Sequence, residues 1–161
     1  MLEAWLRFAI VIFVQLLLFI YHANYENRLV EVPRILARGV LVGILFGLPC
    51  DLVLGKFFGL NSYALGFGAL FLILNGAFAY GIFAANTLLL QRARLPYFYM
   101  WTVFVMAVYE ITNYLFPVWT WEFTLSPAQF VVVGSVGYFG GAIVVAAIWR
   151  VFFGERFLFI V

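Results

Sequence analysis

Two acidic residues lie inside otherwise apolar stretches of the sequence. Asp51 follows the run GILFGLPC, and Glu110 lies within the run AVYEITNYLFPVWTW. A charged side chain is costly in the interior of a bilayer, so acids found there usually have a partner or a function. Two carboxyl groups at one depth could hold a proton between them, and a neutral acid in a dry site can donate that proton. We therefore interpret Glu110 and Asp51 as candidate catalytic residues.

Amide and aromatic side chains near these acids are candidates for binding a ligand. They are Asn75, Asn113, Tyr114, Trp119 and Trp121. Asn113 and Tyr114 follow Glu110 by three and four residues, which predicts one shared helix face on which they orient the carboxyl group. Phe, Tyr and Trp together make up 21% of the chain. An aromatic-walled pocket that ends in an acid would suit an apolar small molecule. The ring faces could also stabilise a positive charge that forms on this molecule.

The sequence contains no motif that is typical of metal, cofactor or nucleic-acid binding. Cys50 is the only cysteine and His22 the only histidine, too few for a metal motif. Phosphate loops and nucleophile elbows are also missing. We expect no metal, no cofactor and no nucleic acid. The expected partners are membrane lipids, an apolar small molecule, and a second copy of the chain or other membrane subunits.

The composition predicts an integral membrane protein. The 161 residues are 67% hydrophobic and 10% charged, and the mean hydropathy is +1.11. A soluble domain of this size could not bury so much apolar surface. No charged residue occurs from Phe57 to Gln91, a run longer than the roughly 20 residues that cross a bilayer core. We expect one integral membrane domain over residues 1–161.

Apolar runs predict an all-α, polytopic helix bundle with about five transmembrane helices. Their expected ranges are 4–22, 39–58, 62–90, 96–116 and 128–153. The third is longer than one crossing needs, so it should be tilted, broken or interfacial at its start. In the last helix, Gly137 and Gly141 are expected to face another helix, because small residues let membrane helices approach closely.

The basic residues predict the orientation. Seven fall at one end of the expected bundle, namely Arg28, Arg34, Arg38, Arg92, Arg94, Arg150 and Arg156. Only Arg7 and Lys56 fall at the other end. By the positive-inside rule the first end is cytoplasmic. The N-terminus should then lie outside and the C-terminus in the cytoplasm, in the cytoplasmic membrane of a bacterium or archaeon.

The two acids also correspond in a weak internal repeat between residues 39–90 and 96–153. The alignment that places Asp51 on Glu110 also places Tyr80 on Phe139 and Gly81 on Gly140. This correspondence puts both acids at one depth. We expect their carboxyl groups within about 10 Å of each other, on helices that pack together, with at least one of them protonated.

Two family resemblances suggest different functions. Glu110, followed by Trp119, Trp121 and Phe123, resembles the acidic helix and the Trp/Phe arrangement of the lycopene cyclase domain. Proteins of that family are small, membrane-embedded and helical, and they close isoprenoid rings by protonation. This resemblance implies an isoprenoid or lipid-like ligand, with catalysis by an acid.

The stretch GILFGLPCDLVLGKFFG, which carries Gly43, Gly47, Asp51, Gly55 and Gly59, is similar to a segment of the MreD cell-shape family. That resemblance implies a non-catalytic scaffold or assembly subunit in cell shape and wall synthesis. A third alternative is the substrate-binding component of a small-solute transporter, which would need a polar cavity. We favour the apolar-ligand protein.

Overall fold

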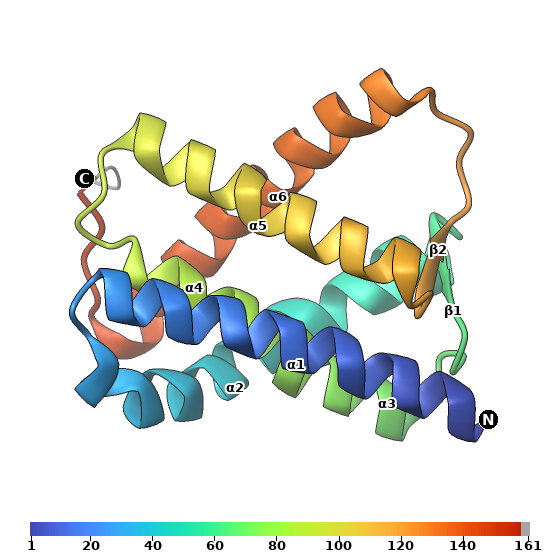
Figure 1. Cartoon of the computed structure of the whole chain (residues 1–161), viewed down its shortest axis with the longest axis horizontal. Coiled ribbons are helices and arrows are strands. Elements are labelled where there is room, and N and C mark those ends of the chain that lie inside the picture. The colour runs from blue at the N-terminus through green and yellow to red at the C-terminus, as the bar shows by residue number, and fades with distance from the viewer. Residues whose placement is uncertain (159–161) are drawn as a thin grey trace.

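The structure, a computed structural model that describes residues 1–158, is a bundle of long helices with one short strand pair (Figure 1). The helices are α1 (Leu2–Tyr25), the 3-10 turn η1 (Leu29–Glu31), α2 (Val32–Cys50), the π-helix η2 (Asp51–Phe57), α3 (Ala69–Asn75), the π-helix η3 (Gly76–Tyr80), α4 (Gly81–Leu89), α5 (Leu95–Leu115) and α6 (Pro127–Phe153). The strands are β1 (Asn61–Tyr63) and β2 (Trp119–Trp121). The predicted all-α membrane bundle is confirmed.

Four helical segments are long and apolar enough to cross a membrane. They are Leu2–Tyr25, Leu29–Phe57, Ala69–Leu89 and Pro127–Phe153. The fifth predicted helix, α5, has 21 residues, a length of about 31 Å. It begins next to the end of α4 and ends at the strand pair, so it runs between the same two ends of the bundle as the others (Figure 1). The expected helices are therefore all present.

Local sequence signals explain where several helices begin and end. Proline lies in the first turn of α2, α5 and α6, where its missing N–H has no helical partner to lose. At the start of α6, the Ser126 hydroxyl accepts from the Gln129 N–H, and the Gln129 side chain accepts from the Ser126 N–H, a capping box. Gly154 ends α6 with φ at 68°, a conformation that favours glycine.

The third predicted helix differs from the observed one at its start. Residues 61–63 form β1, and the helix begins only at Ala69. Gly66 has a positive φ of 68° in the intervening turn, which glycine adopts without strain. The expectation of a helix from residue 62 is wrong because β1 is held by pairing with β2, which lies far away in the sequence.

The strand pair relates two halves of the chain. β1 and β2 are antiparallel and centred on the pair Ser62 and Thr120. Each half of the chain has the order helix, strand, helix: α2–η2, β1 and α3–η3–α4 in the first half, and α5, β2 and α6 in the second. Equivalent strands that pair antiparallel about their centres imply a pseudo-two-fold axis along the bundle, as in parallel repeats of membrane proteins. This geometry supports the predicted duplication.

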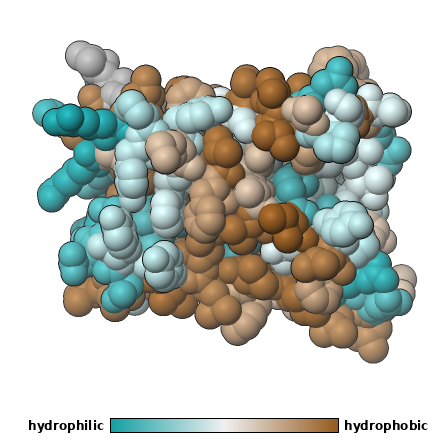
Figure 2. Space-filling model, turned by 45° about the horizontal axis from the view of Figure 1, so that its top comes forward, coloured by the Kyte–Doolittle hydropathy of each residue, from teal (hydrophilic) through white to brown (hydrophobic). Residues whose placement is uncertain are grey.

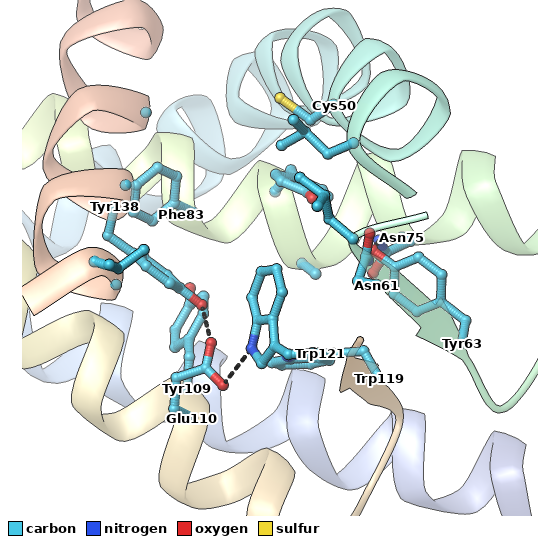
Figure 3. A pocket seen from close by; sticks show the side chains of 18 of the residues that line it. Cys50, Asn61, Tyr63, Asn75, Phe83, Tyr109, Glu110, Trp119, Trp121 and Tyr138 are labelled. Atoms are coloured by element: carbon cyan, nitrogen blue, oxygen red, sulfur yellow. Dashed lines mark hydrogen bonds between the residues drawn. The ribbon is translucent and has the colours of Figure 1, made fainter. Parts of the chain in front are cut away.

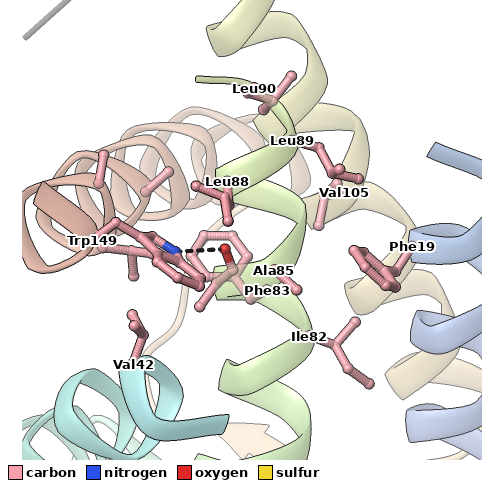
Figure 4. Packing of buried hydrophobic residues seen from close by; sticks show 14 of the residues in the cluster. Phe19, Val42, Ile82, Phe83, Ala85, Leu88, Leu89, Leu90, Val105 and Trp149 are labelled. Atoms are coloured by element: carbon pink, nitrogen blue, oxygen red, sulfur yellow. Dashed lines mark hydrogen bonds between the residues drawn. The ribbon is translucent and has the colours of Figure 1, made fainter. Parts of the chain in front are cut away.

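The hydrophobic core draws on all five long helices. The indole N–H of Trp149 on α6 donates to the Ala84 carbonyl of α4 at 2.9 Å (Figure 4). Phe19 of α1, Val42 of α2 and Val105 of α5 belong to the same buried cluster. This cluster ties the two halves together near the end of the bundle opposite the strands.

Glycines form a seam between α2 and the helix η3–α4. A Cβ added at Gly39 would lie 2.7 Å from the Gly81 carbonyl oxygen, and one at Gly43 would lie 2.5 Å from the Gly81 Cα. A Cβ at Gly47 would overlap the Tyr80 ring. Because every fourth residue falls on one helix face, these glycines together allow close backbone approach. Part of the Gly-x-x-x-Gly pattern that resembles MreD thus packs helices within this chain.

The expectation for the glycines of α6 is half right. A Cβ at Gly141 would lie 3.2 Å from the Phe46 ring, so Gly141 faces α2 as predicted. A Cβ at Gly137 would have no atom within 4 Å outside its own helix, so the prediction that Gly137 faces another helix is wrong. Gly137 lines a cavity instead.

Hydrophilic residues gather at both ends of the long axis, and hydrophobic residues cover much of the middle (Figure 2). The N-terminus lies at the strand end of the bundle, and α6 ends near the opposite end (Figure 1). At that opposite end Arg28 pairs with Glu31, and Arg38 lies 3.5 Å from Glu155. The protein is thus shaped for a membrane, and which end faces the cytoplasm stays a prediction.

Candidate functional site

A cavity of about 330 Å³ lies between the two halves of the chain, next to the strand pair. It is bounded by α2 and η2, by α5, by α6 and by both strands. Its lining is mostly apolar and rich in rings: Phe46, Phe83, Phe123, Phe130, Tyr63, Tyr80, Tyr109, Tyr138, Trp119 and Trp121. The aromatic-walled pocket expected from the sequence is therefore present.

Glu110 is the one acid in the lining of this cavity, among the residues that the structure describes. The Tyr138 hydroxyl donates to its Oε1 at 2.9 Å, and the Trp121 indole N–H donates to its Oε2 at 3.2 Å (Figure 3). No ion pair within residues 1–158 involves Glu110. The site thus holds an acid with neutral donors on both oxygens and, within that range, no cation to balance it.

Asp51 has a fuller set of donors and does not line the cavity. Its Oδ1 accepts from the Tyr63 hydroxyl at 2.6 Å and from the Tyr80 hydroxyl at 2.8 Å. Its Oδ2 accepts from the Asn75 amide at 2.9 Å. These three donors line the cavity themselves, but they turn their polar atoms toward Asp51. Asp51 therefore acts as the centre of a closed network behind the cavity wall.

Two π-helical segments position this network. The segment η2 begins at Asp51, and η3 ends at Tyr80. Pro49 lies just before η2, where it removes one helical hydrogen bond and disfavours regular α-helix. Short π segments shift the side chains that follow them and occur often at functional sites. Here they bring Asp51 and Tyr80 into contact across two helices.

Tyr63 belongs to β1, outside the membrane-spanning helices. Burial, followed by the neighbouring Asp51 carboxyl group, raises the pKa of the Tyr63 phenol far above its usual range. The phenol therefore keeps its proton at any physiological pH. It remains a hydrogen-bond donor to Asp51.

The two halves supply one acid each, on different sides of the cavity. Figure 3 shows Glu110 and Tyr138 on one side and Asn75 and Tyr63 on the other. Tyr80 donates to Asp51 in the first half, and Tyr138 donates to Glu110 in the second. Tyr138 thus has for Glu110 the role that Tyr80 has for Asp51, and it lies one position before Phe139, the residue that the alignment places on Tyr80.

The expected packing between the two acid-bearing helices is wrong. The segment η2, which carries Asp51, contacts α2 and β1, and α2 packs mainly on α4, η3 and α6, whereas α5 packs on α6 and α1. The two carboxyl groups make no hydrogen bond to each other among the described residues, and each has donors from its own half. The two acids are therefore separate groups with separate surroundings.

The predicted ligand-binding residues divide into two groups. Asn75, Trp119 and Trp121 line the cavity, whereas Asn113 and Tyr114 do not. The Asn113 Oδ1 accepts from the Val118 N–H at 2.8 Å and from the Trp119 N–H at 3.0 Å, so Asn113 holds the loop before β2.

Tyr114 is 84% exposed. The proposed orientation of Glu110 by Asn113 and Tyr114 is wrong because α5 ends at Leu115. A side chain in the last turn of a helix is free to bond the backbone that follows it.

Gln15, Tyr109 and Tyr138 are among the lining residues that were not identified from the sequence. A shift of one position pairs Tyr80 with Tyr138 but places Asp51 on Tyr109, so one ungapped alignment does not match both the acids and their tyrosines. Gln15 is a single amide within the apolar run IVIFVQLLLFI of the first helix, which was a visible signal. Tyr109 directly precedes Glu110, and its ring does not differ in type from the many aromatic residues around it.

His22 and Asn86 form a second buried polar pair, 3.1 Å apart between Nδ1 and Oδ1. His22 is fully buried. Within residues 1–158, no three His, Cys, Asp or Glu side chains gather as metal ligands would. This pair lies within the packed core and joins α1 to α4.

We expect Asp51→Asn to destabilise the protein. The amide that replaces one carboxylate oxygen would face hydroxyl or amide donors, and buried donors without an acceptor cost about 2–3 kcal/mol. Tyr80→Phe, which removes one donor and leaves two, should cost about 1 kcal/mol. Thermal unfolding of both variants in one detergent checks this order. An Asp51→Asn protein that unfolds at the wild-type temperature would contradict the structural role.

No family model, curated protein or solved structure matches this chain.

Proposed function

We propose that this protein binds an apolar, lipid-like molecule in the cavity and presents Glu110 to it. The observation that carries the proposal is the aromatic-walled cavity with one acid that no cation within residues 1–158 balances. Largely apolar cavities of this size with a few polar groups typically hold small ligands. The surroundings of Glu110 favour a functional role over a structural one, because an intramembrane acid kept only for stability would be enclosed, as Asp51 is.

Access from the side, through the membrane, is part of the proposal. Leu54 and Val133 both line the cavity, and they are 43% and 51% exposed on the apolar surface. They lie on η2 and α6, at the boundary between the two halves. An opening between these helices would face lipid tails, so an apolar ligand could enter without crossing water.

The finer form of the proposal is acid catalysis on an isoprenoid. The Glu110 carboxyl group would transfer its proton to one carbon of a double bond, leaving positive charge on the other carbon. A second double bond of the same molecule would attack that carbon, which closes a ring and moves the positive charge to the far carbon of the second double bond. The carboxylate would then remove a proton from a carbon next to this charge, which gives the neutral cyclic alkene and restores the acid. Tyr138 and Trp121 are placed to donate to the carboxylate, and aromatic faces stabilise the cation.

The two alternatives have less support. A scaffold like MreD would offer its glycine-rich face to a partner, but Gly39, Gly43 and Gly47 are occupied by η3 and α4 of the same chain. A carrier for a polar solute would need a polar cavity, and this lining is mainly aromatic and aliphatic.

Filling the cavity tests the proposed function. We expect Gly137→Phe to fold normally, because a Cβ there meets nothing within 4 Å, but to exclude the ligand from the cavity it lines. Gly140→Phe is the matched control: it lies on the same helix, has equal space and does not line the cavity. Mass spectrometry of lipid extracts from purified proteins should find an apolar molecule enriched with the wild type and the control, but not with Gly137→Phe. Identical extracts from all three would exclude the proposal.

A further inference from the structure

Two buried polar side chains in the cavity lining have atoms without hydrogen-bond partners among the described residues. Gln15 on α1 is 1% exposed, and neither its Oε1 nor its Nε2 has a partner there. Tyr109 on α5 is 4% exposed, and its hydroxyl also has none within residues 1–158. Both residues line the same cavity as Glu110, and α1 packs directly on α5.

Such groups are costly unless something binds them. A buried amide or hydroxyl that loses its water without gaining a partner destabilises the folded state. Most buried polar atoms in proteins are satisfied, so an exception calls for an explanation. Several other buried polar side chains of this chain do find partners: Thr87 donates to Phe83 and Thr102 to Phe98. Five described residues have a buried polar side-chain atom without a hydrogen-bond partner; Gln15 and Tyr109 line the cavity, and the other three, His22, Gln91 and Trp101, do not.

We infer that the ligand carries a hydroxyl group, which Gln15 and Tyr109 bind; this inference rests on the proposed function. The Gln15 amide can donate and accept hydrogen bonds, and the Tyr109 hydroxyl can also donate or accept one. A ligand hydroxyl accepts one hydrogen bond and donates another, so it matches this pair. A plain hydrocarbon would leave all three atoms unpaired. The ligand class is therefore a lipophilic alcohol, with its apolar part along the aromatic wall.

A series of probes with one carbon skeleton tests this inference on the full chain in lipid nanodiscs. Farnesol has a hydroxyl group, farnesyl methyl ether has only the acceptor oxygen, and farnesene has no oxygen. A change in tryptophan fluorescence reports binding, because Trp119 and Trp121 line the cavity. Wild-type protein should bind farnesol about tenfold more tightly than farnesene, the effect of one to two net hydrogen bonds. The ether should fall between them.

Variants connect that preference to the two residues. Gln15→Leu and Tyr109→Phe should each reduce the ratio of farnesol affinity to farnesene affinity about three- to tenfold. Tyr99→Phe, an exposed tyrosine on the same helix as Tyr109, is the matched control and should keep the full preference. Without ligand, Gln15→Leu should unfold about 2–4 °C above the wild type, because an unpartnered buried amide is removed. A structural role for Gln15 would lower that temperature.

The outcomes separate the two proposals. Equal binding of farnesol and farnesene, equal binding of farnesol and its ether, or an unchanged preference in Gln15→Leu would overturn the inference while leaving the cavity as an apolar site. An unchanged preference would also mean that water satisfies the amide. Absence of binding for every probe, or binding that Gly137→Phe does not weaken, would overturn the proposed function and the inference with it.

Discussion

Glu110→Gln should abolish the proposed acid catalysis and leave the fold intact. The glutamine keeps the shape of the side chain and one acceptor oxygen for Tyr138 or Trp121. An amide has no acidic proton, and loss of a general acid typically lowers turnover about 10²- to 10⁴-fold. Mass spectrometry of membrane lipids, compared between cells that express the wild type and the variant, measures the loss of product.

Glu122→Gln is the matched control for this experiment. Glu122 accepts from the Ser62 hydroxyl beside the strand pair, is not fully buried and does not line the cavity. The control should therefore behave as the wild type. Normal product formation by Glu110→Gln would show that Glu110 is not the acid, and the scaffold alternative would then gain support.

Gly43→Ala should prevent stable folding. The added Cβ would overlap the Gly81 backbone nitrogen and the Gly76 carbonyl oxygen. These are backbone atoms, which cannot turn aside as the end of a flexible side chain can. α2 would have to separate from η3 and α4, and overpacking of this kind costs about 3 kcal/mol or more. The same separation would pull Asp51 away from Tyr80.

Thermal unfolding and size-exclusion chromatography in a mild detergent measure this effect. Gly140→Ala is the control, because a Cβ there meets nothing within 4 Å. Alanine is favoured over glycine inside a helix by roughly 0.5–1 kcal/mol, so the control should be as stable as the wild type or more stable. If Gly43→Ala unfolded at the wild-type temperature, the close approach of α2 to α4 would be disproved.

Much of the helical architecture follows from local sequence. Apolar runs locate the five long helices, and Pro96 and Pro127 mark two of their starts. The strand pair does not follow, because β1 and β2 are very short and are held by each other across a long stretch of intervening chain. In an apolar region, the sequence of such a short strand cannot be distinguished from the start of a helix.

The candidate site was predictable in its acids and less so in their partners. Asp51 and Glu110 are visible because an acid inside an apolar run is unusual. Tyr80 and Tyr138 are not, because nine tyrosines are spread through the chain and only packing decides which ones reach a carboxyl group. The prediction that Asn113 orients Glu110 failed because the direction of a side chain in the last turn of a helix depends on the loop that follows. The two acids can be assigned different roles only when their hydrogen-bond donors are known.

Entry from the side, as proposed for this cavity, would change what selects the ligand. A molecule that moves from lipid tails into an aromatic pocket leaves one apolar solvent for another, so removal from water supplies little of the binding free energy. The concentration that matters is then the mole fraction in the bilayer, and the competitors are the acyl chains themselves. Discrimination against such an excess must come from shape and from the few polar atoms in the lining, which are scarce but are the contacts that a lipid tail cannot make.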